Sequence, residues 1–152
     1  MTDAPATSAI DLQHLLLLLQ HGDGQFPSGA FGFSWGLEGM LADGMVRPDG
    51  LQAAIGSLLA ERWAPFDRLV VRRAWRAGGD ADRLAALDAE VEACLLVPAE
   101  RSGSARAGAA LLASHARLAN PAAAPLRAAI QAGDMKGHRP VVEGALWRGL
   151  GL

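Results

Sequence analysis

With 152 residues the chain has the length of one domain that can bury a hydrophobic core, and its net charge of -2 gives no electrostatic case for binding nucleic acid or an anionic membrane. The single cysteine cannot form an internal disulfide, which fits a reducing compartment, and the apolar run at residues 15–19 is far too short to span a bilayer. We therefore expect a cytoplasmic protein, and the abundance of Ala, Leu and Arg with few β-branched residues favours an all-α fold.

The N-terminal third predicts two helices separated by a loop. After a flexible start at residues 1–9, a first helix is expected at residues 10–21. It carries an apolar stripe with helical spacing, made of Leu12, Leu15, Leu16 and Leu19. A helix this apolar either lies in the centre of the core or faces a partner as well as the core. A short helix is expected at residues 34–43, with Glu38 in its first turn and Gly44 after its end.

The remaining chain predicts a series of packed helices. Asp49 and Gln52 resemble a capping box that opens a helix to about Trp63, and Pro65 is expected to end it. Asp80 is expected to cap a later helix that Pro98 breaks or kinks. The other helices are expected at residues 66–77, 100–118, 121–132 and 141–150, with Pro140 opening the last one. These elements predict a single all-α domain of seven or eight helices over residues 10–152.

The expected last helix is amphipathic, and its apolar face needs a partner. The apolar positions are Val142, Ala145, Leu146 and Leu150. Because the chain stops just after them without a polar tail, we expect the sequence to be a shortened one.

No catalytic or cofactor motif is present. The only lysine, Lys136, is followed by Gly137, so the chain has no phosphate-binding loop. The glycines at 29, 32 and 36 are not the dinucleotide fingerprint, and the nucleophile elbow is absent. Ser34 is interpreted as a helix cap, with a nucleophile as the alternative. We therefore expect no enzyme activity, no catalytic residue and no cofactor.

The histidine and cysteine positions do not predict a metal site. His14 and His21 are seven residues apart, too far for the usual pair at i and i+4, so we expect no metal site within one chain, although a surface histidine shared with a partner remains an alternative. Cys94 is expected to be buried and inert, and His115 to be a partly exposed structural residue. His138 is the histidine most readily functional, although a solvated turn at residues 136–139 is the default interpretation.

One stretch, "FPSGAFGFSWGLE" at residues 26–38, resembles the signature of the urease accessory protein UreF family, P-x-G-[GA]-F-x-[YFH]-S-x-G-[LM]-E. The positions that match in order and spacing are Pro27, Gly29, Ala30, Phe31, Phe33, Ser34, Gly36, Leu37 and Glu38. Trp35 departs from the residue usual in the family. Two later segments are also similar to family motifs: residues 95–112, with the compressed spacing Glu100-Arg101-Ser102, and residues 137–152, which contain His138.

The resemblance implies an all-helical, cytoplasmic protein that is not itself an enzyme. Members of the family join UreD (also called UreH) and the GTPase UreG in a complex that loads nickel into apo-urease, with UreE as the nickel donor. Members commonly dimerise, so a homodimer within the complex is expected. They also continue past this point with further helices, so the resemblance implies a shortened member or a fragment.

On this basis we expect the partner-binding residues to be Pro27, Gly29, Phe31, Phe33, Ser34, Trp35, Glu38, Glu100, Arg101 and His138. Pro27 would stiffen a tight corner that Gly29 permits, and the aromatic residues would be anchors. For Phe31 and Phe33, plugging the core is an equal alternative, whereas partner contact is favoured for Trp35.

Three other interpretations remain open at the level of sequence. The chain could be a helical interaction module unrelated to urease. It could be a non-functional fragment. It could also be a hydrolase that uses Ser34 or His138.

Overall fold

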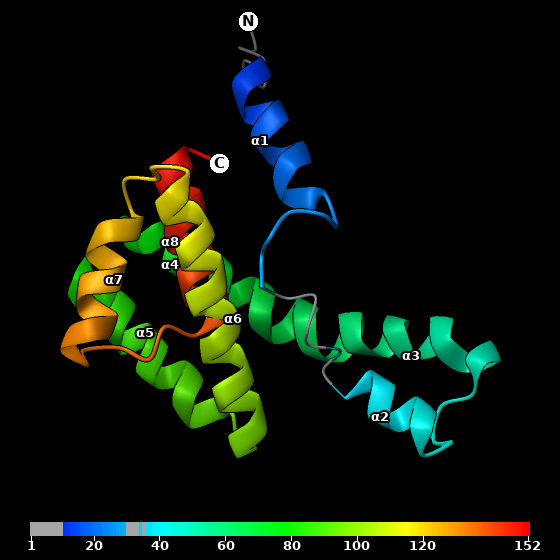
Figure 1. Cartoon of the computed structure of the whole chain (residues 1–152). Helices are drawn as coiled ribbons and strands as arrows, with labels where there is room; N and C mark the ends of the chain where they lie inside the picture. The colour runs from blue at the N-terminus through cyan, green and yellow to red at the C-terminus, as the bar shows by residue number, and fades with distance from the viewer. Residues whose placement is uncertain (1–10, 30–33, 35) are drawn as a thin grey trace, which may run out of the picture.

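The computed structural model describes residues 11–29, 34 and 36–152, and the regular structure of these residues is entirely helical, as predicted. The elements in chain order are α1 (Leu12–Gly22), α2 (Leu37–Ala42), the 3-10 turn η1 (Pro48–Gly50), α3 (Leu51–Ser57), the π-helix η2 (Leu58–Asp67), α4 (Arg68–Ala77), α5 (Ala81–Cys94), α6 (Pro98–Arg117), α7 (Ala123–Ala132) and α8 (Arg139–Leu150). Figure 1 shows a compact body formed by α4 to α8, with α1 on one side of it and an arm formed by α2, α3 and η2 on another.

Helix α8 forms the centre of the body and packs mainly against α4 and α6. Its buried residues are Pro140, Val141, Val142, Gly144, Ala145 and Leu146. A β carbon on Gly144 would overlap the backbone of α4 at the carbonyl oxygen of Val71, so these two helices approach as closely as they do because position 144 has no side chain. The apolar face of the last helix, for which the sequence predicts a partner, is thus covered within the same chain.

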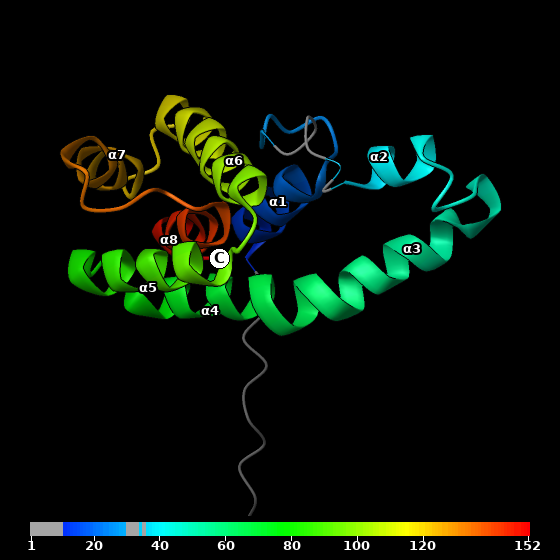
Figure 2. The ribbon, with the colours of Figure 1, turned by 90° about the horizontal axis from the view of Figure 1, so that it is seen from below.

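Helices α3, η2 and α4 form one continuous rod, so the break expected at Pro65 is wrong (Figure 2). The backbone stays in the right-handed helical region at both ends of η2, and the N–H of Arg68 donates to the carbonyl of Trp63, five residues earlier. This wider hydrogen-bond register accommodates a proline that an α-helix interior excludes. The expected capping box is also wrong: Asp49 forms an exposed ion pair with Arg47 at 3.4 Å, and α3 begins after η1 without a side-chain cap.

Helix α1 forms within two residues of the predicted range but does not enter the core. Asp11 caps it by accepting the N–H of Gln13 at 3.2 Å, and none of its residues is buried. Its exposed leucines have relative exposures between 43% and 67%: Leu12, Leu15, Leu16, Leu18 and Leu19. Of the two alternatives for this helix, a place in the centre of the core is therefore wrong for the chain on its own.

The arm also leaves large apolar side chains uncovered. Ile55, Leu59 and Trp63 are exposed at successive turns of the rod, and none of the residues of α2, α3 or η2 is buried. Within the described residues, no helix combines the length and the apolar character that crossing a membrane requires.

Candidate functional site

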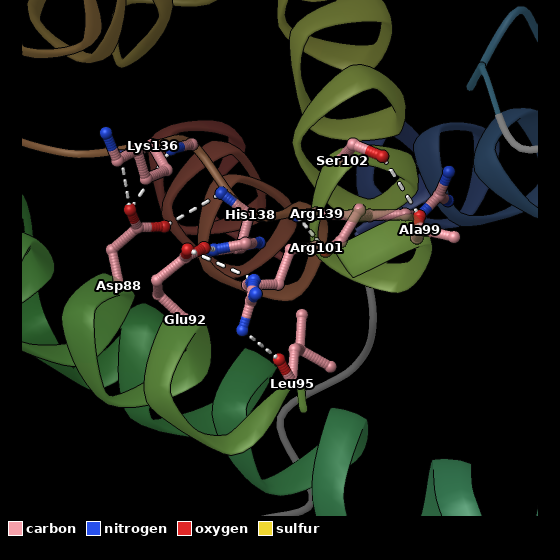
Figure 3. A network of polar contacts seen from close by, with 11 residues as sticks. Asp88, Glu92, Leu95, Ala99, Arg101, Ser102, Lys136, His138 and Arg139 are labelled. Atoms are coloured by element: carbon pink, nitrogen blue, oxygen red, sulfur yellow. Dashed lines mark hydrogen bonds and ion pairs between the residues drawn. The ribbon is translucent and has the colours of Figure 1, made fainter. Parts of the chain in front are cut away.

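The turn at residues 136–139 is held by a buried carboxylate from α5 (Figure 3). Asp88, on α5, accepts the backbone N–H groups of Lys136 at 2.5 Å, Gly137 at 3.1 Å and His138 at 2.8 Å. Its side chain is 1% exposed, and His138 is fully buried. The default interpretation of a solvated turn is therefore wrong, because a buried carboxylate requires donors and these three N–H groups supply them.

The same turn packs closely against α6. Gly137 has a φ of +76°, which favours glycine, and a β carbon on Gly108 would overlap the carbonyl oxygen of Gly137. The hydroxyl of Ser104 accepts the N–H of Arg139 at 3.2 Å, close to the start of α8. Gly108 and Ser104 of α6 thus contact the turn and the first residue of α8.

His138 and Arg101, two of the expected partner-binding residues, are brought together by a third residue that the sequence did not single out. Glu92 accepts from Nε2 of His138 at 2.7 Å, and its other oxygen lies 3.5 Å from Nε of Arg101 (Figure 3). Arg101 also donates to the carbonyl of Leu95 at 2.9 Å. Because the imidazole is fully buried, His138 cannot touch a partner directly. Its role in this arrangement is to position the chain between α5 and α8.

Only one ring nitrogen of His138 has a polar contact among the described residues. Nε2 lies 2.7 Å from a carboxylate oxygen of Glu92, whereas Nδ1 is a buried side-chain atom with no hydrogen-bond partner there. The contact with Glu92 therefore fixes the orientation of the ring through Nε2 alone.

Glu100 lies on the other side of α6 and ties that helix to the arm. Its carboxylate lies 3.7 Å from Arg62, whose Nε donates to Asp67 at 3.1 Å and whose guanidinium stacks over Phe66 at 5.1 Å. Burial raises the pKa of Asp67, an effect that the charge of Arg62 opposes. Glu100 therefore does not join Arg101 and His138 in one site.

The corner predicted at Pro27 and Gly29 exists and sits on α6. The hydroxyl of Ser114 donates to the carbonyl of Pro27 at 2.7 Å, and Arg139 donates to the carbonyl of Ser28 at 3.0 Å. Gly29 has a φ of +73°, and a β carbon there would overlap the side chain of Ala110. The start of the signature stretch is thus fixed to the body through its backbone.

The rest of the signature stretch is described only in part. Phe31, Phe33 and Trp35 lie outside the described residues. The hydroxyl of Ser34 accepts the N–H of Glu38 at 3.4 Å, so this serine caps the first turn of α2 from two residues before its N-cap position. Glu38 itself is exposed.

A second buried network joins α1 to the body. The side-chain amide of Asn120 donates to the carbonyl of Leu146 at 2.9 Å and faces Nδ1 of His115 at 3.0 Å, while its oxygen accepts the N–H of Ala122. Nδ1 of His115 is therefore the acceptor, and its Nε2–H donates to Nε2 of His21 at 3.2 Å. Nδ1 of His21 in turn donates to the carbonyl of Leu17 at 2.7 Å.

This network shows that the interpretation of His115 as a partly exposed residue is wrong. It also leaves no lone pair for a metal between His115 and His21. His115 is fully buried, not partly exposed. Burial, with a smaller effect of His21, lowers its pKa to about 4. A metal bridging the two Nε2 atoms would require a proton on Nδ1 of His115, which would then face the amide N–H of Asn120.

The expectation for the single cysteine can also be compared with the structure. Cys94, the last residue of α5, is exposed, so the prediction of a buried thiol is wrong. The buried stripe of this helix passes from Val91 to Leu95, which leaves position 94 on its outer edge. Among the described residues, no group of three or more His, Cys, Asp or Glu side chains could hold a metal ion.

The fold and these anchored loops define a class: an all-helical protein with a rigid body and exposed apolar helix faces, a combination typical of proteins that bind other proteins. The UreF family model matches residues 45–152, so the chain belongs to the UreF family. The matched residues include Glu100, Arg101 and His138, whereas the signature stretch at residues 26–38 precedes them.

A curated relative supports the same assignment. The chain is similar to the urease accessory protein UreF of Rhizobium johnstonii (strain DSM 114642 / LMG 32736 / 3841), with 38% identity over 84 residues. The aligned residues make up 55% of this chain and 38% of the relative, so the match spans well under half of the relative's length. No solved structure matches the chain.

Proposed function

We propose that this protein is a urease accessory protein that acts as a non-catalytic scaffold in the cytoplasm. In this role it forms a complex with UreD (also called UreH) and the GTPase UreG, as a homodimer within the complex, and the complex inserts nickel into apo-urease. The observation that carries the proposal is the family match over residues 45–152, which spans the whole of the compact body.

The arrangement of the exposed surfaces supports a scaffold. Helix α1 presents five exposed leucines, and the arm presents Ile55, Leu59 and Trp63, so both offer apolar area to other proteins. The signature stretch at residues 26–38 starts from a corner that α6 holds in place through Pro27 and Gly29. A segment fixed at its base binds a partner at a lower entropic cost, which is why Phe31, Phe33, Ser34, Trp35 and Glu38 are proposed as contacts.

The remaining expected residues act through the fold. Arg101 and His138 are positioning residues, because they link α5, α6 and the start of α8 through Glu92. Glu100 holds the arm in relation to α6 through Arg62. Substitution of any of the three is proposed to weaken partner binding by moving the surfaces that bind.

The test is reconstitution in a urease-negative host. The tagged chain is co-expressed with the urease subunits, UreD, UreG and UreE in medium with nickel, and co-purification, urease activity and nickel content are measured. Retention of UreD or UreG and nickel-loaded urease are expected with the chain and not without it. A chain that retains neither partner would instead be an unrelated interaction module or a non-functional fragment.

The hydrolase alternative has its own control. Ser34→Ala removes the hydroxyl that caps α2, and we expect it to leave urease maturation close to normal. Turnover of an ester or amide substrate by the purified chain that is lost in Ser34→Ala would favour the hydrolase over the scaffold.

A further inference from the structure

A groove of about 490 Å³ lies between α6 and α7. Its wall is apolar and consists mostly of short side chains. The residues that form it are Ala109, Leu112, Ala113, Ala116 and Ile130. Ala109 and Ala113 are exposed, so the groove opens to solvent along α6. The two helices form a hairpin joined by residues 118–122 (Figure 1).

The rim of the groove is positively charged. Arg117 and Arg127 line it from the two helices, together with Gln131. Both arginines are exposed, and neither forms an ion pair with a carboxylate among the described residues; Arg117 makes one long hydrogen bond to the hydroxyl of Ser114, at 3.4 Å. Residues 101–133 contain four arginines and no Asp or Glu, although the whole chain has a net charge of -2. The groove therefore lies in a cationic segment of an otherwise acidic chain.

We infer that this groove binds an amphipathic helix of another protein, one that presents aliphatic side chains on one face and carboxylates along its flank. The stretch from Ala109 to Ala116 spans about 10 Å, or two helical turns, which matches aliphatic side chains at i, i+4 and i+7 of a docked helix. Alanines in the wall let a second helix approach closely, and the unpaired guanidinium groups of Arg117 and Arg127 favour carboxylates on that helix. The inference does not depend on a role in urease maturation.

The experiment is a selection with the intact chain. A phage library of helical peptides, in which leucines are fixed at i, i+4 and i+7 and the flanking positions are random, is panned against the wild-type chain. Selected peptides are then synthesised, and their dissociation constants are measured by fluorescence anisotropy at low and high salt. We expect Asp and Glu to be enriched at the flanks and binding to weaken with salt, because exposed ion pairs are screened.

Two variants with matched controls locate the binding site. Arg117→Glu with Arg127→Glu should weaken binding of the selected peptide at least tenfold, whereas Arg72→Glu with Arg76→Glu, two exposed arginines of α4, should change it less than twofold. Ala113→Trp should block the groove, whereas Ala93→Trp, at an exposed site of α5, should not. Circular dichroism melting verifies that each variant is folded. If the charge-reversal variant melts at a lower temperature than the wild-type chain, Arg117→Gln with Arg127→Gln replaces it.

Three results would overturn the inference. The first is an enrichment of Lys and Arg at the flanking positions, or a selection that enriches no peptide. The second is binding that survives both the charge reversal and Ala113→Trp. The third is a dimer of the chain, seen by sedimentation, that Ala113→Trp dissociates, because the occupant would then be a second copy of this chain.

Discussion

The α carbon of Gly108 faces the carbonyl oxygen of Gly137 so closely that a β carbon on Gly108 would overlap this oxygen. The contact joins α6 to the turn that leads into α8, and Asp88 holds the same turn from the side of α5. The turn is thus held on one side by a close backbone contact with α6 and on the other by a side chain of α5.

Gly108→Ala should therefore lower the free energy of unfolding by about 1–3 kcal/mol, because the backbone must shift to make room. Gly56→Ala is the control, since Gly56 lies in α3 and has no atom within 4 Å of an added β carbon. That substitution should be neutral or stabilising by about 0.5–1 kcal/mol. Urea denaturation followed by circular dichroism gives both values, and equal values for the two variants would contradict the close contact.

Asp88→Ala should destabilise the body by roughly 3 kcal/mol, because it leaves the N–H groups of residues 136–138 without their acceptor. Asp88→Asn retains one acceptor oxygen and should lose less. Asp82→Ala, in the exposed first turn of the same helix, is the control and should lose about 0.3–1 kcal/mol at most. Thermal melts of the three variants test this order, and a mild Asp88→Ala would show that water replaces the carboxylate.

The stability of the chain should fall on mild acidification because of His115. Burial lowers its pKa in the folded state to about 4, below the value of 6.5 for a free histidine, so the unfolded chain takes up the proton first. The contribution of neutral His115 is fully present above pH 6.5 and is lost progressively as the pH falls from 6.5 towards 4, by about 3 kcal/mol.

The raised pKa of Asp67 acts in the opposite direction, because acidification relieves the cost of burying its charge. The measurement is therefore a comparison of urea midpoints between pH 7.5 and 4.5 for the wild-type chain and His115→Gln. Both proteins keep Asp67, so the difference in slope isolates His115. Identical pH profiles would mean that His115 takes up its proton equally in the folded and unfolded states.

The leucines of α1 should matter for partners and little for the fold. Leu16→Glu with Leu19→Glu changes side chains that are 57% and 63% exposed, so the melting temperature should change little. Co-purification of UreD or UreG in the reconstituted system should fall by at least tenfold if these leucines are buried in the complex.

Gln13→Glu with Gln20→Glu places the same charges at exposed polar positions of the same helix and is the matched control. It should retain the partners. Loss of binding in both pairs would indicate an effect of charge alone, and no loss in either would exclude the leucine face as a contact.

Local signals in the sequence were enough to locate most helices. Asp80 caps α5 by accepting the N–H of Arg83, and Gly44 and Gly78 adopt the positive φ that the end of a helix requires. Such features depend on a few neighbouring residues, which a single sequence contains in full. Pro65 misled for the same reason: it breaks an α-helix, but the wider hydrogen-bond register of η2 accommodates it.

The residues of the buried polar networks could not be found from local signals in the sequence. Asp88 and Glu92 occupy ordinary positions of a helix. Their roles as hydrogen-bond acceptors depend on a turn some 50 residues later in the chain. His115 is buried because Asn120 and His21 supply its hydrogen bonds. The nearest signal was the position of Asp88 directly beside Leu87, on the buried stripe of α5.

The sequence by itself determined that this protein is helical, where most of its helices lie and which family it belongs to, because periodicity, caps and motifs are local properties of the chain. Only the tertiary structure decided which apolar stripes are covered. Helices α1 and α8 both carry apolar stripes, yet α8 is buried between α4 and α6 while the leucines of α1 are exposed. The physical reason is that burial depends on which helices pack around a stripe, and that is set by contacts between residues far apart in the chain.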